Sequence, residues 1–173
     1  MMTATENDLY NLFNELNINT QTFRHPPLFT VDESQKLRGE ITGCHCKSLF
    51  LKDKKSNFIL LVMAEDQPLD MKALFKSKTL NIDGLNIGRL SFASADRMIE
   101  MLGVKPGSVT PFSLINVKNK DLIVALDKTM LENEYLNYHP LHNEATTTIH
   151  KDDLLKFIEY FGFKPIIVDF DQI

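Results

Sequence analysis

One candidate for a chemical role is the loop Lys105-Pro106-Gly107-Ser108-Val109-Thr110-Pro111-Phe112. The two prolines restrict the backbone near either end of this loop. Gly107 has no side chain, so its backbone amide can come close to a ligand. The same composition is also typical of an ordinary loop between two elements, so a binding role depends on the rest of the chain.

A lysine and a histidine are the next candidates. Lys47 follows shortly after Gly43, and His139 opens the segment His139-Pro140-Leu141-His142-Asn143. On its own, His139 also suits a hydrogen-bonded structural histidine. The sequence has no Ser/His/Asp order, no nucleotide-binding glycine fingerprint and no Walker loop. The familiar signatures of covalent and nucleotide-dependent enzymes are therefore missing.

Cys44-His45-Cys46 is a third candidate, as a metal site or as a thiol nucleophile. His139 and His142 would be possible further metal ligands. Structural zinc sites usually separate paired cysteines by two to four residues and use a second pair, which this chain lacks. Small buried cysteines are also common without any chemistry. We expect no metal and no cofactor, and no disulfide framework, which fits a reducing compartment.

The composition indicates one folded domain covering residues 1–173. Hydrophobic residues make up 43% and charged residues 24% of the chain, as in an average globular protein. The longest apolar stretch, 58–64, is far shorter than the roughly 20 residues that span a membrane, and the first residues do not resemble a signal peptide. We expect a cytoplasmic protein with no membrane partner.

The charge pattern is uneven. The net charge of −4 argues against broad, nonspecific nucleic-acid binding, and no DNA partner is expected. Two groups of lysines could nevertheless form local basic faces. They are Lys47, Lys52, Lys54 and Lys55, and then Lys72, Lys76 and Lys78. Solvated lysines on a hairpin and on a helix are the simpler interpretation.

Hydrophobic periodicity predicts the elements that must position these residues. Alternation and β-branched content predict strands at 21–24, 47–52, 58–63, 89–92, 122–126, 135–138, 145–149 and 166–168. Caps and helical spacing predict helices that begin after Thr5, at the capping box Thr30–Glu33, near Met71, at Ser94 and at Lys151. The clearest hairpin joins 47–52 to 58–63. The predicted fold is α/β (α+β), with a mixed, mostly antiparallel sheet surrounded by helices.

Taken together, these segments resemble the editing domain inserted in bacterial prolyl-tRNA synthetases and its free-standing YbaK/ProX-type relatives. The resemblance covers nearly the whole chain in order. It rests on His25-Pro26-Pro27, Phe29-Thr30-Val31-Asp32-Glu33, Lys47-Ser48-Leu49-Phe50-Leu51-Lys52-Asp53, Gly107-Ser108-Val109-Thr110-Pro111-Phe112, His139-Pro140-Leu141-His142-Asn143 and Asp153-Leu154-Leu155. The subfamily most similar to this sequence is the alanyl-tRNA(Pro) deacylases, and the cysteine-removing relatives are the alternative.

The resemblance implies hydrolysis of the ester that joins a wrong amino acid to the 3′ end of proline tRNA. It implies that tRNA as partner, with prolyl-tRNA synthetase as a further candidate partner. It implies a catalytic set of Lys47, Gly107 and His139. The implied substrate-binding residues are His25, Leu28, Phe29, Ser48, Pro111, Phe112 and Asn143. Ser48 stands where the family would have asparagine, so the amino-acid preference is open.

An aminoacyl ester is already activated, so the chemistry needs positioning more than a covalent nucleophile. Amides around Gly107 could stabilise the developing oxyanion, an effect of roughly 3 kcal/mol per good donor. Lys47 could hold a phosphate of the terminal adenosine. His139 could orient water or hold the loop. Leu28, Phe29 and Phe112 could form the wall of a pocket too small for proline, or simply pack in the core.

Two functions of other classes remain open from the sequence. One is a non-catalytic module of the same fold that binds tRNA ends or a free amino acid. The other is a thiol or metal protein that uses Cys44 and Cys46.

Overall fold

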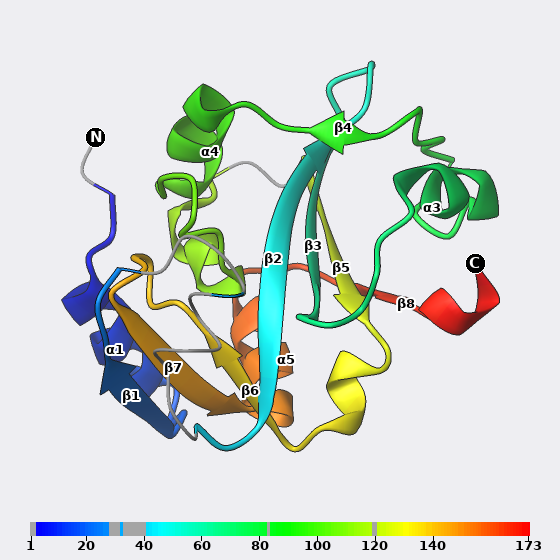
Figure 1. The fold of residues 1–173 in the computed structure, drawn as a ribbon. Coiled ribbons are helices and arrows are strands. Elements are labelled where there is room, and N and C mark those ends of the chain that lie inside the picture. The colour runs from blue at the N-terminus through cyan, green and yellow to red at the C-terminus, as the bar shows by residue number, and fades with distance from the viewer. Residues whose placement is uncertain (1–2, 28–31, 33–40, 83, 119–120) are drawn as a thin grey trace.

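A mixed sheet of eight strands forms the centre of the computed structural model, which describes residues 3–27, 32, 41–82, 84–118 and 121–173 (Figure 1). The strand order is β1-β7-β6-β2-β3-β5-β8, and β4 pairs with β2 off this path. The strands are β1 (Thr20–Arg24), β2 (Cys44–Lys52), β3 (Phe58–Ala64), β4 (Ser91–Phe92), β5 (Leu122–Asp127), β6 (Tyr135–Tyr138), β7 (Ala145–His150) and β8 (Ile166–Val168).

The pairing confirms the predicted mixed and mostly antiparallel sheet. The antiparallel pairs are β1–β7, β2–β3, β2–β4 and β6–β7, while β2–β6, β3–β5 and β5–β8 are parallel. The predicted hairpin is the longest ladder, running from the pair Lys52↔Phe58 to the pair Cys46↔Ala64. The polar turn 53–57 closes it because the Asp53 carboxylate accepts hydrogen bonds from the amides of Lys55 and Asn57.

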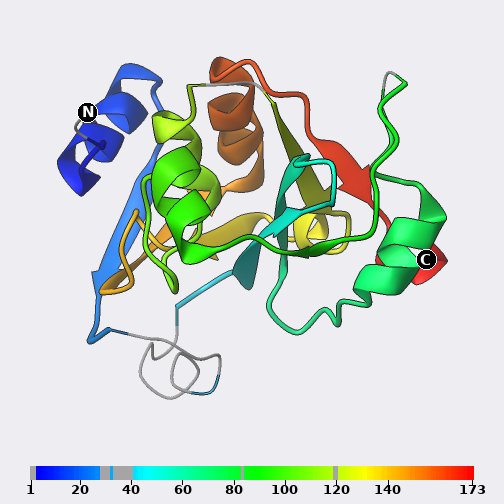
Figure 2. The same ribbon diagram turned by 90° about the horizontal axis from the view of Figure 1, so that it is seen from above.

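The two faces of the sheet carry two separate hydrophobic cores. Because successive side chains of a strand point to opposite faces, Leu60 and Val62 of β3 join one core while Ile59 and Leu61 join the other. Three helices cover the first core: α1 (Glu6–Glu15), α4 (Ala95–Leu102) and α5 (Lys151–Tyr160). Helix α3 (Met71–Ser77) packs on the second core through Leu74. Figure 2 shows α3 well separated from the other three helices.

Local signals explain where the helices begin and end. Thr5 and Asp8 form a capping box at the start of α1, and Ser94 caps α4. Gly103 ends α4 in the left-handed conformation, with φ of 66°, which glycine adopts without steric cost. The predicted helix that begins at Thr30 lies outside the described residues.

Two segments differ from the sequence-based expectation. The strand predicted at 89–92 is reduced to Ser91–Phe92, because its partner β2 ends at Lys52 and offers only Leu51 and Lys52 for pairing. The apolar run after Pro111 forms a 3-10 helix, η1 (Pro111–Asn116), whose N-cap Thr110 accepts a hydrogen bond from the amide of Phe112. Two short 3-10 helices, η2 (Met130–Glu132) and η3 (Phe170–Gln172), complete the described elements.

Candidate functional site

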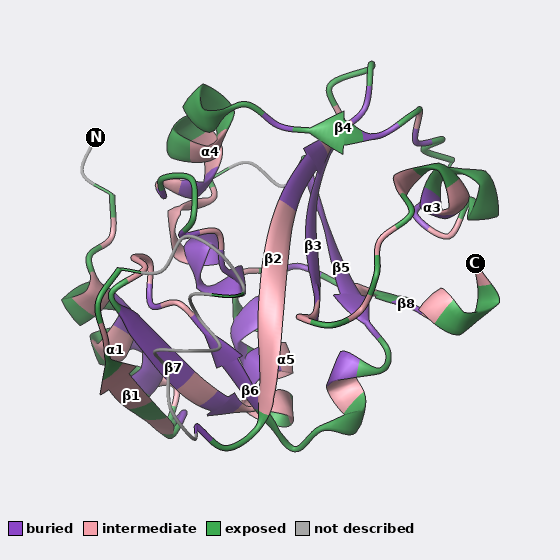
Figure 3. Cartoon of the chain, viewed as in Figure 1, coloured by how far each residue is buried: buried purple, intermediate pink, exposed green. Residues whose placement is uncertain are grey.

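The sheet opens between its central strands β2 and β6. Only two pairs join these strands, Cys44↔Leu136 and His45↔Asn137, and β6 ends one residue later at Tyr138. Residues 44–49 of β2 are all partly exposed, although β2 is a central strand, whereas residues 58–63 of β3 are all buried (Figure 3). A partly exposed central strand beside a ladder of only two pairs makes this region the candidate site.

Lys47 and His139 occupy equivalent positions at this opening. Each lies two residues beyond the last pair, His45↔Asn137. Because side chains alternate along a strand, Lys47 projects from the same face as His45. His139 follows the end of β6, at the position that would face Lys47 if the parallel ladder continued. The sequence alone had separated these two residues by more than half of the chain.

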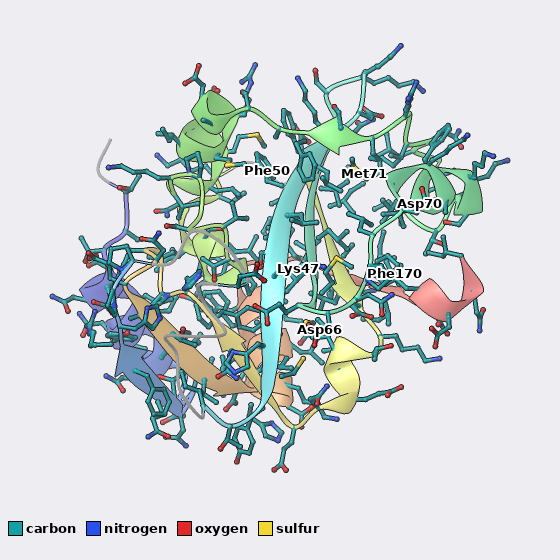
Figure 4. The ribbon with its side chains drawn as sticks, viewed as in Figure 1. Lys47, Phe50, Asp66, Asp70, Met71 and Phe170 are labelled. Atoms are coloured by element: carbon teal, nitrogen blue, oxygen red, sulfur yellow. The ribbon has the colours of Figure 1, made fainter. Side chains whose placement is uncertain are left out.

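The ammonium group of Lys47 is held by main-chain carbonyls beyond the end of β3. Its Nζ donates to the carbonyl oxygen of Glu65 at 2.9 Å and to that of Gln67 at 2.5 Å. Partial burial lowers the pKa of Lys47, while the nearby carboxylates of Asp66, Glu65 and Asp127 act in the opposite direction. Figure 4 shows Lys47 midway along β2, with Asp66 close to it. Two of the three ammonium protons are thus engaged, and the third remains for a ligand.

His139 is held in one tautomer. Its Nδ1 lies 2.9 Å from the carbonyl oxygen of Ala145, which can only accept, so Nδ1 carries the proton and Nε2 is an acceptor when the ring is neutral. Burial lowers the pKa of His139, and the neighbouring rings of His25 and His142 add to this, against the Ala145 hydrogen bond. The imidazole is therefore neutral at pH 7.

His25 supports His139 directly. The two rings meet edge to face with centroids 6.2 Å apart. Nδ1 of His25 donates to the carbonyl oxygen of Pro26 at 2.8 Å, and its Nε2 lies 2.9 Å from the hydroxyl of Thr146. Both ring nitrogens are thus engaged by the protein, and His25 is placed to position His139 rather than to react itself. The structure brings together these two histidines, which were predicted separately.

Gly107 lies in a turn with a left-handed backbone conformation. Gly107 has φ of 86°, a conformation that favours glycine, and its residue is exposed. The amide of Ser108 donates to the carbonyl of Lys105 at 3.0 Å and closes the turn. Pro111 is buried at the start of η1. The exposed turn at Gly107 is thus held by a buried anchor, the first residues of η1.

Phe112 belongs to that anchor and does not form an open pocket wall. It is 0% exposed, and its ring packs edge to face on Phe13, Tyr138 and Phe157, with centroids 5.1 to 5.6 Å apart. The expectation that Phe112 lines the amino-acid pocket is therefore wrong, because the side chain fills the first core. Since Tyr138 precedes His139, this contact connects the glycine loop to the end of β6.

The remaining candidates have different outcomes. Ser48 lies one position from Lys47 and therefore points to the opposite face of β2, the side of the first core. Asn143 is half-buried in the connection between β6 and β7. Leu28 and Phe29 lie outside the described residues.

The two cysteines differ, since a hydrogen bond with Cys46 lowers the pKa of the Cys44 thiol, whereas Cys46 has the features of a structural residue. The thiol of Cys46 donates to the carbonyl of Cys44 at 3.3 Å. Burial raises the pKa of Cys46 well above its usual value, which keeps this thiol protonated and a poor nucleophile. Within the described residues, no group of three or more histidine, cysteine, aspartate or glutamate side chains is placed to hold a metal. In that same part of the chain, no helix has the length and apolar content to cross a membrane.

Some contributors to the site had no readable signal in the sequence. The carbonyls of Glu65 and Gln67 act through the backbone, so their residue types carry no information about their role. Thr146 lies in a β-branched run that reads simply as a strand. Only the register of β1 and β7, which are far apart in the chain, brings its hydroxyl to His25.

Comparison with known proteins identifies relatives of this chain. The family model described as "Aminoacyl-tRNA editing domain" matches residues 25–157. Prolyl-tRNA synthetase associated domain-containing protein 1 of Mus musculus is 36% identical over 159 residues, covering 90% of each chain. Prolyl-tRNA editing protein ProX of Acetoanaerobium sticklandii is 34% identical over 155 residues, covering 88% of this chain and 90% of its own.

Solved structures share the fold at lower sequence identity. A candidate trans-editing enzyme for prolyl-tRNA synthetase superposes with a TM-score of 0.66 at 18% identity and covers 98% of both chains. The family match spans Lys47, Gly107 and His139, and relatives above 30% identity extend over nine-tenths of the chain. This chain therefore belongs to the aminoacyl-tRNA editing domain family, as the resemblance in its sequence had indicated.

Proposed function

We propose that this protein is a deacylase that hydrolyses the ester of a mischarged proline tRNA, and that alanine is the amino acid it removes. The observation that supports this most directly is the placement of Lys47 and His139 at equivalent positions beyond the last β2–β6 pair. One is a cation and the other a neutral base with a free lone pair. The relatives named for prolyl-tRNA editing supply the class of substrate.

In this proposal, His139 handles the attacking water. Its Nδ1–H is fixed on the carbonyl of Ala145, so Nε2 can accept a hydrogen bond from water and take up its proton. The depressed pKa keeps this nitrogen unprotonated at neutral pH. His25 and Thr146 restrict the ring from the side. No covalent intermediate is required, in agreement with the buried and protonated thiol of Cys46.

Lys47 and Gly107 act on negative charge. The carbonyls of Glu65 and Gln67 fix the ammonium position, so its remaining proton can contact a phosphate of the terminal adenosine without further ordering of the side chain. The exposed turn at Gly107 offers backbone amides to the oxyanion that forms as water adds to the ester. Both groups are fixed before the substrate arrives, which is the arrangement that electrostatic stabilisation requires.

The choice of alanine follows from size. A synthetase site built for proline discriminates weakly against a smaller amino acid, because each methylene changes binding by only about 1 to 3 kcal/mol. A second site that admits alanine and excludes proline improves accuracy. The same site would serve the cytoplasmic pool of tRNA, and prolyl-tRNA synthetase would be the protein that supplies its substrate.

The test is a panel of tRNA(Pro) charged with alanine, cysteine or proline and incubated with the purified protein. We expect rapid loss of alanine, slower loss of cysteine and no loss of proline beyond that in buffer. Lys47→Ala should abolish the loss, whereas Lys76→Ala, which removes an exposed lysine on α3, should not. Faster release of cysteine would assign the cysteine activity. Binding without release of any amino acid would overturn the proposal in favour of a binding module.

A further inference from the structure

Four strands, β2, β3, β4 and β5, have ends that lie together at one end of the sheet. The hairpin between β2 and β3 lies there, since Lys52 pairs with Phe58. The start of β5 lies beside it through the pair Phe58↔Leu122, and β4 is attached through Lys52↔Ser91. We call this region, residues 52–57 and 84–92, the hairpin end. It is at the top of Figure 1, where β2 meets β4.

The exposed charges within residues 52–57 and 84–92 are all positive, while Asp121 is exposed beside them at the start of β5. Lys54, Lys55 and Arg89 are exposed, and Lys52 is half-buried. The one acidic residue in these two segments is Asp53, which is 3% exposed. Its carboxylate is occupied by the amides of Lys55, Asn57 and Gly88 and by the side-chain amide of Asn57, all within 2.7 to 2.9 Å. The carboxylate therefore ties the two segments together instead of offering negative charge to the solvent.

The opposite end of the same strands carries several acidic residues together with the exposed Lys128. Strands β3 and β5 both start at the hairpin end. Strand β3 leads to Glu65 and Asp66, and β5 ends at the buried Asp127. Beyond β5, the 3-10 helix η2 is followed by the exposed residue Glu134. Although the net charge is −4, acidic and basic residues are therefore unevenly distributed along the sheet. A polyanion approaching the molecule is attracted to the exposed cations of the hairpin end.

An aromatic surface adjoins the cations. Phe92 of β4 is 57% exposed although its neighbour Ala93 is buried. Solvent-exposed aromatic rings beside lysines and arginines are what single-stranded nucleic acids use for stacking and phosphate contact. Helix α3 also has an exposed ring, Phe75, beside Lys72 and Lys76, but there the exposed carboxylate of Asp70 lies near the lysines.

Strand β2 connects this surface to the candidate active site. Lys47 and Lys52 lie on the same strand, five residues apart. At about 3.3 Å per residue, their Cα atoms are separated by roughly 17 Å. Stacked nucleotides advance by roughly 3.4 Å each along one strand, so this distance corresponds to about five of them. An ester at Lys47 would place the nucleotides that precede it, and the start of the acceptor stem, at the hairpin end.

We propose that the hairpin end binds the phosphate backbone of the tRNA acceptor end while the ester occupies the site at Lys47. This inference rests on the proposed function, because it takes tRNA as the substrate. Lys54, Lys55 and Arg89 contact phosphates, and Phe92 stacks on an unpaired base. The contact is sequence-independent and fixes how far the 3′ end reaches along β2.

The experiment compares Lys54→Ala/Lys55→Ala with a matched pair on α3, Lys72→Ala/Lys76→Ala. Binding of uncharged tRNA(Pro) is measured between 50 and 200 mM salt, and hydrolysis is measured on alanyl-tRNA(Pro) and on 3′-alanyl-adenosine, which lacks the acceptor stem. Log K falls as log salt rises, and each lost phosphate contact reduces the steepness of this dependence by about 0.7 to 0.9. We expect the hairpin pair to lower this steepness by about 1.5 and to reduce kcat/KM on the tRNA at least tenfold. Its activity on alanyl-adenosine should not change.

Three results would overturn the inference. They are an unchanged salt slope in the hairpin pair, an equal loss in the α3 pair, or an equal loss on alanyl-adenosine. Failure of the proposed function is a separate outcome, since a protein that hydrolyses neither ester can still be scored for tRNA binding and its salt dependence.

Discussion

Replacing Lys47 with methionine tests the centre of the proposed mechanism. The substitution keeps most of the side-chain length but removes the ammonium group, which donates to the carbonyls of Glu65 and Gln67 and faces the ligand with its third proton. In the proposed mechanism this proton contacts a charged phosphate, and the loss of such a hydrogen bond costs about 1.5 to 3 kcal/mol, which is about 10- to 150-fold in kcat/KM. We expect kcat/KM on alanyl-tRNA(Pro) to fall by that factor.

The effect on stability should be much smaller. Lys47 is only half-buried, so water can satisfy the two freed carbonyls, and we expect a loss of about 1 kcal/mol or less. For a chain of this size, that corresponds to a decrease in Tm of about 2 to 4 °C. Lys47→Arg, which keeps the charge on a differently shaped group, should retain more activity than Lys47→Met.

Single-turnover deacylation and thermal unfolding of the same preparations provide the measurements. A decrease in activity of less than tenfold, with Tm unchanged, would show that the ammonium does not contact the substrate phosphate. A loss of activity that only follows unfolding would reassign Lys47 to a structural role.

Three further predictions concern the histidine, the glycine turn and the hairpin. Because the pKa of His139 is below its ordinary 6.5 and the neutral ring is the active form, kcat/KM should rise with pH through a midpoint below 6.5, and His139→Gln should lose that limb. The unfolded state binds more protons there, so stability should also fall as the pH drops below about 6.5, less steeply in the variant; equal slopes by thermal unfolding would contradict this. Gly107→Ala forces a side chain into a φ of 86° and should cost about 1 to 2 kcal/mol, with a greater loss of activity than of Tm when both are measured. Asp53→Ala leaves the amides of the hairpin without their acceptor and should lower the free energy of unfolding by about 3 kcal/mol in a urea titration, with Asp8→Ala on α1 as the exposed control.

The elements with strong local signals were predictable from the sequence. The helix starts at Thr5 and Ser94 and the hairpin that joins 47–52 to 58–63 each act through neighbours in the chain, and each is found where it was expected. The helical period of Leu154 and Ile158 likewise predicted α5. Signals of this kind need no knowledge of the tertiary structure.

The site was only partly predictable, because it depends on contacts between distant segments. The residue types of Lys47 and His139 could be selected, but their equivalent positions follow from the parallel pairing of β2 with β6, which no local pattern specifies. Phe112 was misassigned for a similar reason. An aromatic residue after a glycine loop suits a pocket wall or a core equally well, and only its contacts with Phe13 and Tyr138 decide between them.

The entry to β2 gives Gly43 an influence on the reaction that its own chemistry would not suggest. It has φ of 103°, and a Cβ built there would lie 2.6 Å from the carbonyl oxygen of Tyr135 at the start of β6. Any larger residue must push the two strands apart at the short ladder that aligns them. Lys47 and His139 would then be misaligned by a substitution that contacts neither of them. The spacing between cation and base therefore depends on the absence of a side chain at Gly43.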